Sequence, residues 1–338
     1  MATWQQHFSK TAEIFPFMLD VASDQLMLIR LTEEEYSAAS FLDERLLQGG
    51  AEKYVASWSE LTALEPAQSR PVDFIFHIGH VGSTLISRLL GEAQGVFALR
   101  EPLLLRSLAD IERTDRFDSY KTHVLNWLSR SFRAEDRAMI KATSFVNQIA
   151  SELIDDQSRA LFLYVPLQDY METILAGESS RQEVLQMADS RLDRLNHLLP
   201  KPLKIGANNP PCQTIAVSWL CEMASLCEAQ RQRAGAKIMW VNFSEFLAQP
   251  DAGWSKILAH FELKMTASDC SDLLQGPIMN SYSKAPEHDY SADLRRRLLA
   301  DARSQYASEI ADCYSWINDI SGQYPMIEEL VNFSQPKG

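Results

Sequence analysis

The sequence lacks the features of membrane and secreted proteins. It has no run of about 18 apolar residues, the length that a membrane-spanning helix needs. Its N-terminus contains no apolar core of the kind found in a secretory signal. The five cysteines are odd in number and include no Cys-x-x-Cys pair, which argues against a disulfide framework and a zinc site. We therefore expect reduced, mostly buried thiols and a cytoplasmic location.

Basic residues are outnumbered by acidic ones. The chain has 32 Lys and Arg against 45 Asp and Glu, which gives a formal net charge of -13 and a pI near 5.1. Such a surface repels nucleic acid and anionic membranes, so neither is expected as a partner. One small anion site remains compatible with this charge, because a few amides and cations dominate the field locally. A homo-oligomer is left open.

The length allows one large domain with an appendage, or two domains. Residues 1–70 are predicted to form an N-terminal appendage. We expect it to serve in packing or to lie on the substrate side of the protein, and we assign no chemistry to it. Within it, Thr32 is a candidate helix cap, and residues 41–47 are predicted to be helical, with Gly49 and Gly50 as the stop. Residues 71–335 are predicted to form the main domain.

After Pro71, short apolar runs alternate with helical periods. Candidate strands are residues 74–77, 96–99, 138–141, 161–165 and 238–242, and candidate helices include residues 85–90, 120–130, 184–199 and 214–234. Strands that are apolar on both faces and alternate with helices predict an α/β fold. We expect a P-loop-type three-layer fold with a central, mostly parallel sheet flanked by helices. Ligands would bind beyond the carboxyl ends of the strands.

Residues 74–90 contain a candidate phosphate-binding turn between an apolar run and a helical period. Glycines let backbone N–H groups point inward around an anion, and a helix N-terminus adds further unsatisfied amides. The predicted site consists of Gly79, His80, Val81, Gly82, Ser83 and Thr84. A tight turn in which Ser83 only caps the helix fits the spacing equally well. No lysine follows Gly82, so the ATP-type pattern Gly-x-x-x-x-Gly-Lys is absent, which disfavours a kinase or ATPase.

Three segments, residues 74–102, 239–250 and 281–284, together resemble the sulfotransferase family, in particular its bacterial and protein-tyrosine branches. They occur in the order found in that family. The resemblance implies transfer of a sulfuryl group from 3′-phosphoadenosine 5′-phosphosulfate (PAPS) to a hydroxyl or amine. The acceptor would be a small molecule or peptide, the product 3′,5′-ADP, and no metal would be required.

The resemblance also implies roles for individual residues. Glu101 matches the general base that takes the acceptor proton, and Lys141 matches a lysine that neutralises the leaving phosphate or the sulfuryl oxygens. Thr143 stands where small-molecule sulfotransferases carry a catalytic histidine, which again favours Glu101 as the base. His80 replaces the usual cation of the turn, and Lys284 lies in the lysine-bearing C-terminal segment.

Each of these residues also has a structural interpretation. Glu101 could be a surface residue paired with Arg100 or Arg106, and Lys141 could extend its amine from a strand end into solvent. His80 could serve in capping or packing, and for His77 that interpretation is favoured. The arginine run at 295–297 is expected to be a solvated helix face.

The sequence departs from the family at the 3′-phosphate. Val165 and Thr173 stand where family members have an arginine and a serine. Thr173 retains a hydroxyl donor, and Arg181 is the candidate for the missing charge. If neither serves, the 3′-phosphate is poorly recognised, and a donor other than PAPS becomes an alternative. Two alternatives therefore stay open: a nucleotide-dependent phosphotransferase, and a non-catalytic relative that only binds a nucleotide.

Overall fold

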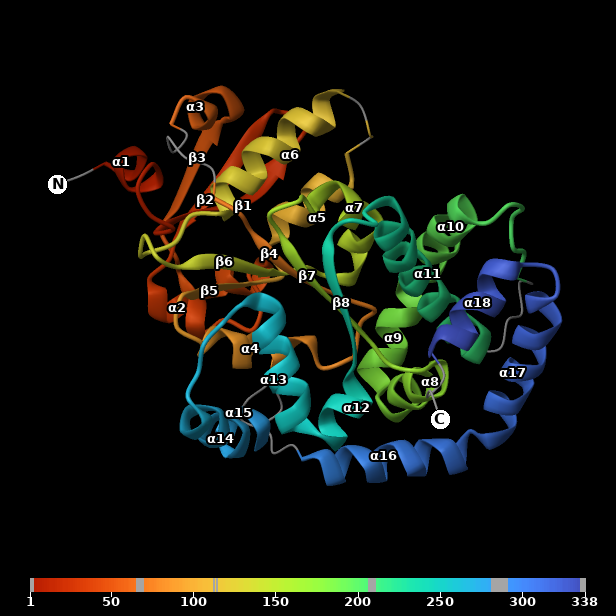
Figure 1. The fold of residues 1–338 in the computed structure, drawn as a ribbon. Coiled ribbons are helices and arrows are strands. Elements are labelled where there is room, and N and C mark those ends of the chain that lie inside the picture. The colour runs from red at the N-terminus through yellow and green to blue at the C-terminus, as the bar shows by residue number, and fades with distance from the viewer. Residues whose placement is uncertain are drawn as a thin grey trace.

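The computed structural model describes residues 3–64, 70–111, 113, 115–205, 211–280 and 291–334. Its centre is a five-stranded parallel sheet with the strand order β5-β6-β4-β7-β8 (Figure 1). The strands are β4 (Asp73–His77), β5 (Val96–Arg100), β6 (Arg137–Lys141), β7 (Arg159–Tyr164) and β8 (Lys237–Asn242). Each predicted strand overlaps an observed one, and the predicted α/β fold class is confirmed.

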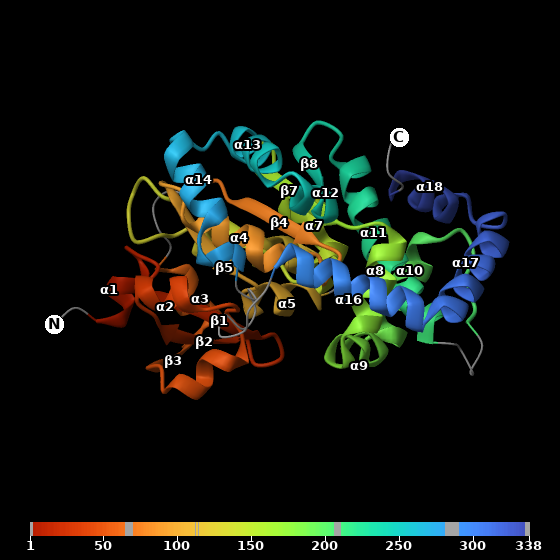
Figure 2. The same ribbon diagram turned by 90° about the horizontal axis from the view of Figure 1, so that it is seen from below.

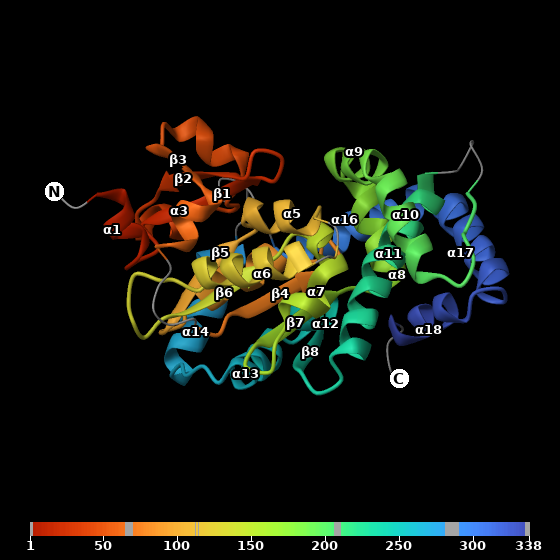
Figure 3. The same ribbon diagram turned by 90° about the horizontal axis from the view of Figure 1, so that it is seen from above.

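Helices cover both faces of this sheet. Helices α4 (Ser83–Gly91) and α13 (Pro250–Phe261) lie on one face, while α5 (Leu103–Ala109), α6 (Asp115–Leu128) and α7 (Ala150–Leu153) lie on the other (Figures 2 and 3). The chain leaves β4 toward β5 on one side, and later passes from β6 to β7 on the opposite side of β4. In such sheets the crevice for a ligand opens where the strand order reverses, here at the end of β4.

The N-terminal segment contains a sheet that the sequence did not predict. Strands β1 (Ile14–Asp20), β2 (Gln25–Arg30) and β3 (Lys53–Ser57) are antiparallel and lie beside α5 and α6 (Figure 3). Short helices α1 (Trp4–Phe8), α2 (Glu33–Ala38) and α3 (Trp58–Thr62) accompany them. Thr32 caps α2 as predicted, since its side chain accepts a hydrogen bond from the Glu35 amide.

The helix predicted over residues 41–47 is present as a 3₁₀ helix, η1 (Glu44–Gly49), but its predicted start is wrong. Asp43 caps it by accepting a hydrogen bond from the Arg45 amide, so the helix begins at Glu44. It ends where Gly50 takes a φ of 74°.

Two buried arginines attach this segment to the main sheet. Arg100 Nη1 donates hydrogen bonds to the carbonyls of residues 36, 37 and 39, at the end of α2. Arg130 donates to the carbonyls of residues 8, 11 and 14. Burial lowers the pKa of each guanidinium to about 10, so both stay charged at neutral pH. Apolar residues of the segment belong to the same hydrophobic core as the parallel sheet.

The remaining helices follow β6, β7 and β8. Those near the site are α8 (Leu167–Ala176), α9 (Glu178–Gln186), α10 (Ala188–Leu198), α11 (Pro211–Gln232), α12 (Phe243–Ala248), the 3₁₀ helix η2 (Ser144–Ile149) and α16 (Ala292–Gln305). Farther along the chain lie α14 (Ala267–Gln275), α15 (Pro277–Asn280), α17 (Ala307–Ser321) and α18 (Pro325–Ser334). The single helix predicted over 184–199 is wrong: the chain breaks at Met187, which has φ -94° and ψ 5°, and forms α9 and α10. In the described part of the chain, no helix combines the length and apolarity needed to cross a bilayer.

Candidate active site

A cavity of about 780 Å³ opens at the carboxyl end of β4. This volume is within the range of small-molecule sites. Residues 79–84 of the predicted turn all line it, together with Glu101 and Thr173. Five arginines and four carboxylates are on its walls: Arg45, Arg106, Arg191, Arg194, Arg295, Asp43, Glu101, Glu183 and Glu222. A chain with a formal charge of -13 therefore has a cavity that is locally positive.

The turn leaves backbone donors facing this cavity. The Ile86 amide bonds to the Gly82 carbonyl at 3.1 Å and starts the hydrogen bonding of α4. Within the described ranges, the amides of Gly82, Ser83 and Thr84 have no acceptor. The interpretation in which Ser83 caps the helix is wrong, because Gly82 occupies the N-cap position and no side chain bonds there. Such a helix N-terminus is a general binding site for anions.

Two residues at the turn have positive φ angles, which restrict the residue types that can occupy these two positions. Gly82 has a φ of 68°, and a Cβ added there would overlap the ring of Phe243, the first residue of α12. His80 has a φ of 54°, which a non-glycine residue adopts only at a cost in free energy. Its ring contacts α9, with Nε2 3.2 Å from a Glu183 carboxylate oxygen and Nδ1 3.3 Å from the Ser180 hydroxyl.

Glu101 and Lys141 form an ion pair next to the turn. The Lys141 side chain is fully buried, and its Nζ donates to Glu101 Oε1 at 2.6 Å and to Thr84 Oγ1 at 2.9 Å. The backbone also holds the pair together, because the Glu101 amide donates to the Lys141 carbonyl at 2.6 Å. Glu101 has a φ of 53°, a second strained residue at this site. Neither structural interpretation holds: Lys141 does not reach solvent, and Glu101 pairs with Lys141, not with Arg100 or Arg106.

The ion pair sets the protonation state of Glu101. Burial alone raises the pKa of this carboxyl, but the Lys141 charge and the nearby His77 outweigh burial and hold it well below its ordinary value of 4.5. Glu101 is therefore a carboxylate at neutral pH and can accept a proton.

His77, for which capping or packing was the favoured interpretation, bonds to the backbone of the turn and also lines the cavity with Glu101. Its Nδ1 accepts a hydrogen bond from the Gly79 amide at 3.0 Å, so the ring proton of the neutral form is on Nε2. Nε2 lies 3.8 Å from Glu101 Oε1. In this tautomer the ring cannot take a proton on the side of Glu101, so Glu101 remains the proton acceptor of the pair.

The residues predicted for the 3′-phosphate are not brought together. The Thr173 hydroxyl donates to the Asp169 carbonyl of its own helix at 2.6 Å, and the Val165 side chain is buried. Arg181 lies in α9, not in a loop, and does not line the cavity. Its guanidinium pairs with Glu178 and donates to the Tyr306 hydroxyl. Lys284 and its segment lie outside the described residues.

Arg295 is one of the cavity cations that the sequence interpretation missed. The expectation of a solvated face holds for Arg296 and Arg297, which are exposed, but Arg295 is half-buried and lines the cavity. Its guanidinium carbon lies 5.7 Å from the centre of the Phe243 ring. Its buried Nη2 has no hydrogen-bond acceptor among the residues described. The apolar residues Leu294, Leu298 and Leu299 of the same helix also line the cavity, which is the sequence signal for this orientation.

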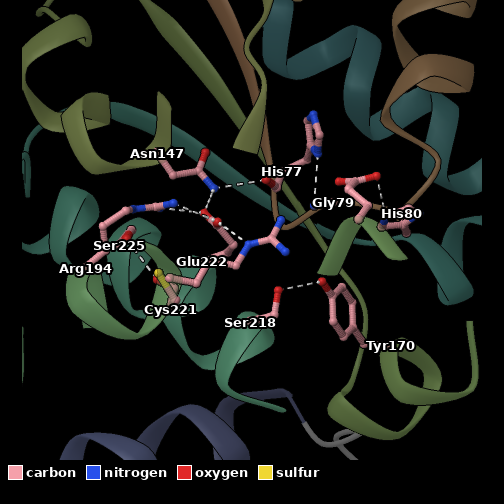
Figure 4. A network of polar contacts seen from close by, with 12 residues as sticks. His77, Gly79, His80, Asn147, Tyr170, Arg194, Ser218, Cys221, Glu222 and Ser225 are labelled. Carbon is pink, nitrogen blue, oxygen red and sulfur yellow. Dashed lines mark hydrogen bonds and ion pairs between the residues drawn. The ribbon is translucent and has the colours of Figure 1, made fainter. Parts of the chain in front are cut away.

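A buried polar network forms another wall of the cavity (Figure 4). Glu222 of α11 is fully buried and accepts hydrogen bonds from Arg194, Arg191 and Asn147. Asn147 Nδ2 also donates to the His77 carbonyl at 3.0 Å, which connects this network to the base of the turn. These residues are far apart in the sequence and carry no motif, so only the fold reveals them. Within the described ranges, no group of three His, Cys, Asp or Glu residues is placed to hold a metal ion.

Comparisons with known proteins give fold similarities only. No family model and no curated protein matches the sequence. Among solved structures, the sulfotransferase domain from the curacin biosynthetic pathway is 12% identical, with a TM-score of 0.42 over 71% of this chain and 99% of that one. Sulfotransferase STF9 from Mycobacterium avium is 12% identical, with a TM-score of 0.41 over 73% and 79%. Mouse sulfotransferase SULT7A1 complexed with PAP is 11% identical, with a TM-score of 0.34 over 64% and 67%. These carry the family name that the sequence motifs indicated, but at such TM-scores the function must be argued from the site.

Proposed function

We propose that this protein is a sulfotransferase that moves a sulfuryl group from PAPS to a hydroxyl or amine of a small-molecule or peptide acceptor. The observation that carries the proposal is one juxtaposition. Gly82, Ser83 and Thr84, whose amides have no acceptor among the described residues, line the same cavity as an ionised Glu101 held by a buried lysine. An anion site, a cation and a proton acceptor are the groups that sulfuryl transfer requires.

In this proposal each group of residues has its own role in the reaction. The turn amides hold the 5′-phosphate side of the donor, and Arg295 supplies the positive charge toward the nucleotide that Val165 cannot. Glu101 takes the proton of the acceptor group as the new bond to sulfur forms. Protonation of Glu101 neutralises its charge, so the Lys141 ammonium becomes available to the negative charge on the leaving phosphate.

Ser83 occupies the position where an ATP-type P-loop has its lysine. The lysine of this site is Lys141 of β6, whose amine donates a hydrogen bond to the Thr84 hydroxyl. We therefore expect ATP to bind less well than 3′,5′-ADP.

Thermal melting with each nucleotide tests the donor. At about a hundred times its dissociation constant, 3′,5′-ADP should stabilise the fold by about 2.7 kcal/mol. With an unfolding entropy of about 2.1 cal/mol/K per residue over 338 residues, this raises the melting temperature by about 4 °C. Greater stabilisation by ATP would favour a phosphotransferase, and no stabilisation by 3′,5′-ADP would refute the proposal.

Glu101→Gln tests the chemistry. With labelled PAPS and an acceptor found among phenols, sugars, amines and tyrosine peptides, transfer should fall about 10²- to 10⁴-fold, the usual contribution of a positioned base. Binding of 3′,5′-ADP should barely change. Glu92→Gln, at an exposed carboxylate at the other end of α4, is the matched control and should leave transfer intact. A Glu101→Gln variant with the wild-type rate would refute the mechanism.

A further inference from the structure

The network around Glu222 contains more positive charge than the Glu222 carboxylate can neutralise. Arg194 contacts both oxygens, with Nη1 3.1 Å from Oε1 and Nη2 2.9 Å from Oε2. Asn147 Nδ2 adds a third hydrogen bond at 2.9 Å from Oε2. Arg191 makes only one longer contact, from Nε to Oε1 at 3.4 Å. Arg194 alone balances the charge of Glu222, so this carboxylate leaves most of the Arg191 guanidinium unused.

Arg191 also has an unused donor in a buried position. The residue is only 3% exposed, and within the described part of the chain its Nη1 has no hydrogen-bond acceptor. Leaving a buried charged donor unsatisfied is costly, so it is expected where a ligand supplies the acceptor. Glu183 of α9 attracts the Arg191 charge, and one of its carboxylate oxygens lies 3.2 Å from His80 Nε2.

The position of Arg191 indicates that its unused N–H group lies in the part of the cavity that would hold the acceptor substrate. Phe243 and Arg295 lie against one side of the turn, at Gly82. The Glu222 network joins the turn at its other end, through the His77 carbonyl, and His77 Nε2 faces Glu101. A group that gives its proton to Glu101 therefore has Arg191 on the adjoining wall.

We propose that the acceptor carries an anionic oxygen group, a carboxylate, sulfate or phosphate, which Arg191 binds while the hydroxyl or amine of the same molecule faces Glu101. A guanidinium with free N–H groups suits such oxyanions, because its fork can bind two oxygens at once. This inference rests on the proposed sulfuryl transfer, and it narrows the acceptors to hydroxy acids, amino acids and their phosphate or sulfate counterparts.

Sulfate is a probe that does not require the acceptor to be known. With the protein saturated by 3′,5′-ADP, the turn is occupied, and added sulfate should bind the Arg191 site and raise the melting temperature. Arg191→Met keeps an unbranched apolar stem, removes the guanidinium and leaves Glu222 paired with Arg194. Its apparent affinity for sulfate should be about 10- to 100-fold weaker, the range expected for one charge-assisted hydrogen bond. General salt effects on stability act on both proteins alike.

Arg296→Met, an exposed arginine on α16, is the matched control and should respond to sulfate like the wild type. In transfer assays, 4-hydroxyphenylacetate should react with a lower KM than its methyl ester, and Arg191→Met should remove this difference without weakening 3′,5′-ADP binding. Equal sulfate responses in wild type and Arg191→Met would overturn the inference and leave the proposed function standing. If 3′,5′-ADP itself did not bind, the proposed function would fail, and this inference with it.

Discussion

The turn at Gly82 offers a quantitative test of the site's geometry through Gly82→Ala. An alanine at a φ of 68° costs about 1 to 2 kcal/mol in backbone strain. Its Cβ would also overlap the Phe243 ring, and overpacking of this kind costs about 1 to 3 kcal/mol. The total of about 2 to 5 kcal/mol, divided by an unfolding entropy of about 0.7 kcal/mol/K for 338 residues, lowers the melting temperature by about 3 to 7 °C.

A double-mutant cycle separates the two contributions. Phe243→Leu removes the ring atoms Cζ, Cε1 and Cε2 that the new Cβ would strike. In that background Gly82→Ala should cost only the backbone strain, so the cycle should show a coupling of about 1 to 3 kcal/mol. Calorimetric melting of the four proteins measures it, with agreement between calorimetric and van't Hoff enthalpies as the check on two-state unfolding.

Gly235→Ala is the matched control, because a Cβ at Gly235 would meet nothing within 4 Å. It should leave the melting temperature nearly unchanged. If Gly82→Ala were equally costly with and without the Phe243 ring, the steric argument would be wrong. If Gly82→Ala cost nothing in either background, the left-handed backbone conformation assigned to Gly82 would be wrong, and so would the direction of the turn amides.

Three further predictions concern charges. The pKa of Glu101 lies below its ordinary 4.5, so its ion pair stabilises the fold above about pH 4.5, and this contribution is lost as the pH falls further. The difference in melting temperature between wild type and Glu101→Gln should therefore shrink between pH 7 and pH 3. Glu222→Gln removes the carboxylate that pairs with two buried arginines, which should cost about 3 to 5 kcal/mol, measurable by urea unfolding. A loss below 1 kcal/mol would contradict the network. Arg295→Met should weaken 3′,5′-ADP about 10- to 100-fold in calorimetric titration with no change in folding; unchanged affinity would remove Arg295 from the donor site.

The parallel sheet and the turn were predictable because their signals are local. Buried strands are short and apolar throughout, and the glycines at 79 and 82 fall between such a strand and a helical period. The small antiparallel sheet was missed because strand β1 contains Pro16, which disrupts its register, and because its strands mix exposed and buried positions irregularly.

The charged walls of the cavity could not be predicted in the same way. Arg194 and Glu222 are 28 residues apart on different helices, and their pairing depends on how α10 packs against α11. Arg295 belongs to a run of three arginines, and only the rotation of α16 about its axis decides which of them faces inward. Side-chain direction in long helices follows from tertiary packing, which a single sequence specifies only indirectly.

The N-terminal segment completes the cavity, although no chemistry was expected there. Phe41, Asp43 and Arg45 line it. The Arg45 guanidinium carbon lies 3.6 Å from the centre of the Phe41 ring, and the Lys141 amine lies 4.9 Å from it. A loop from outside the parallel sheet thus forms the wall next to the reacting groups. Exchanging residues 40–46 between related chains would then alter which molecules are accepted while the anion turn and the sheet stay as they are. Substrate range can diverge in such a protein through one surface loop, without loss of the chemistry beneath it.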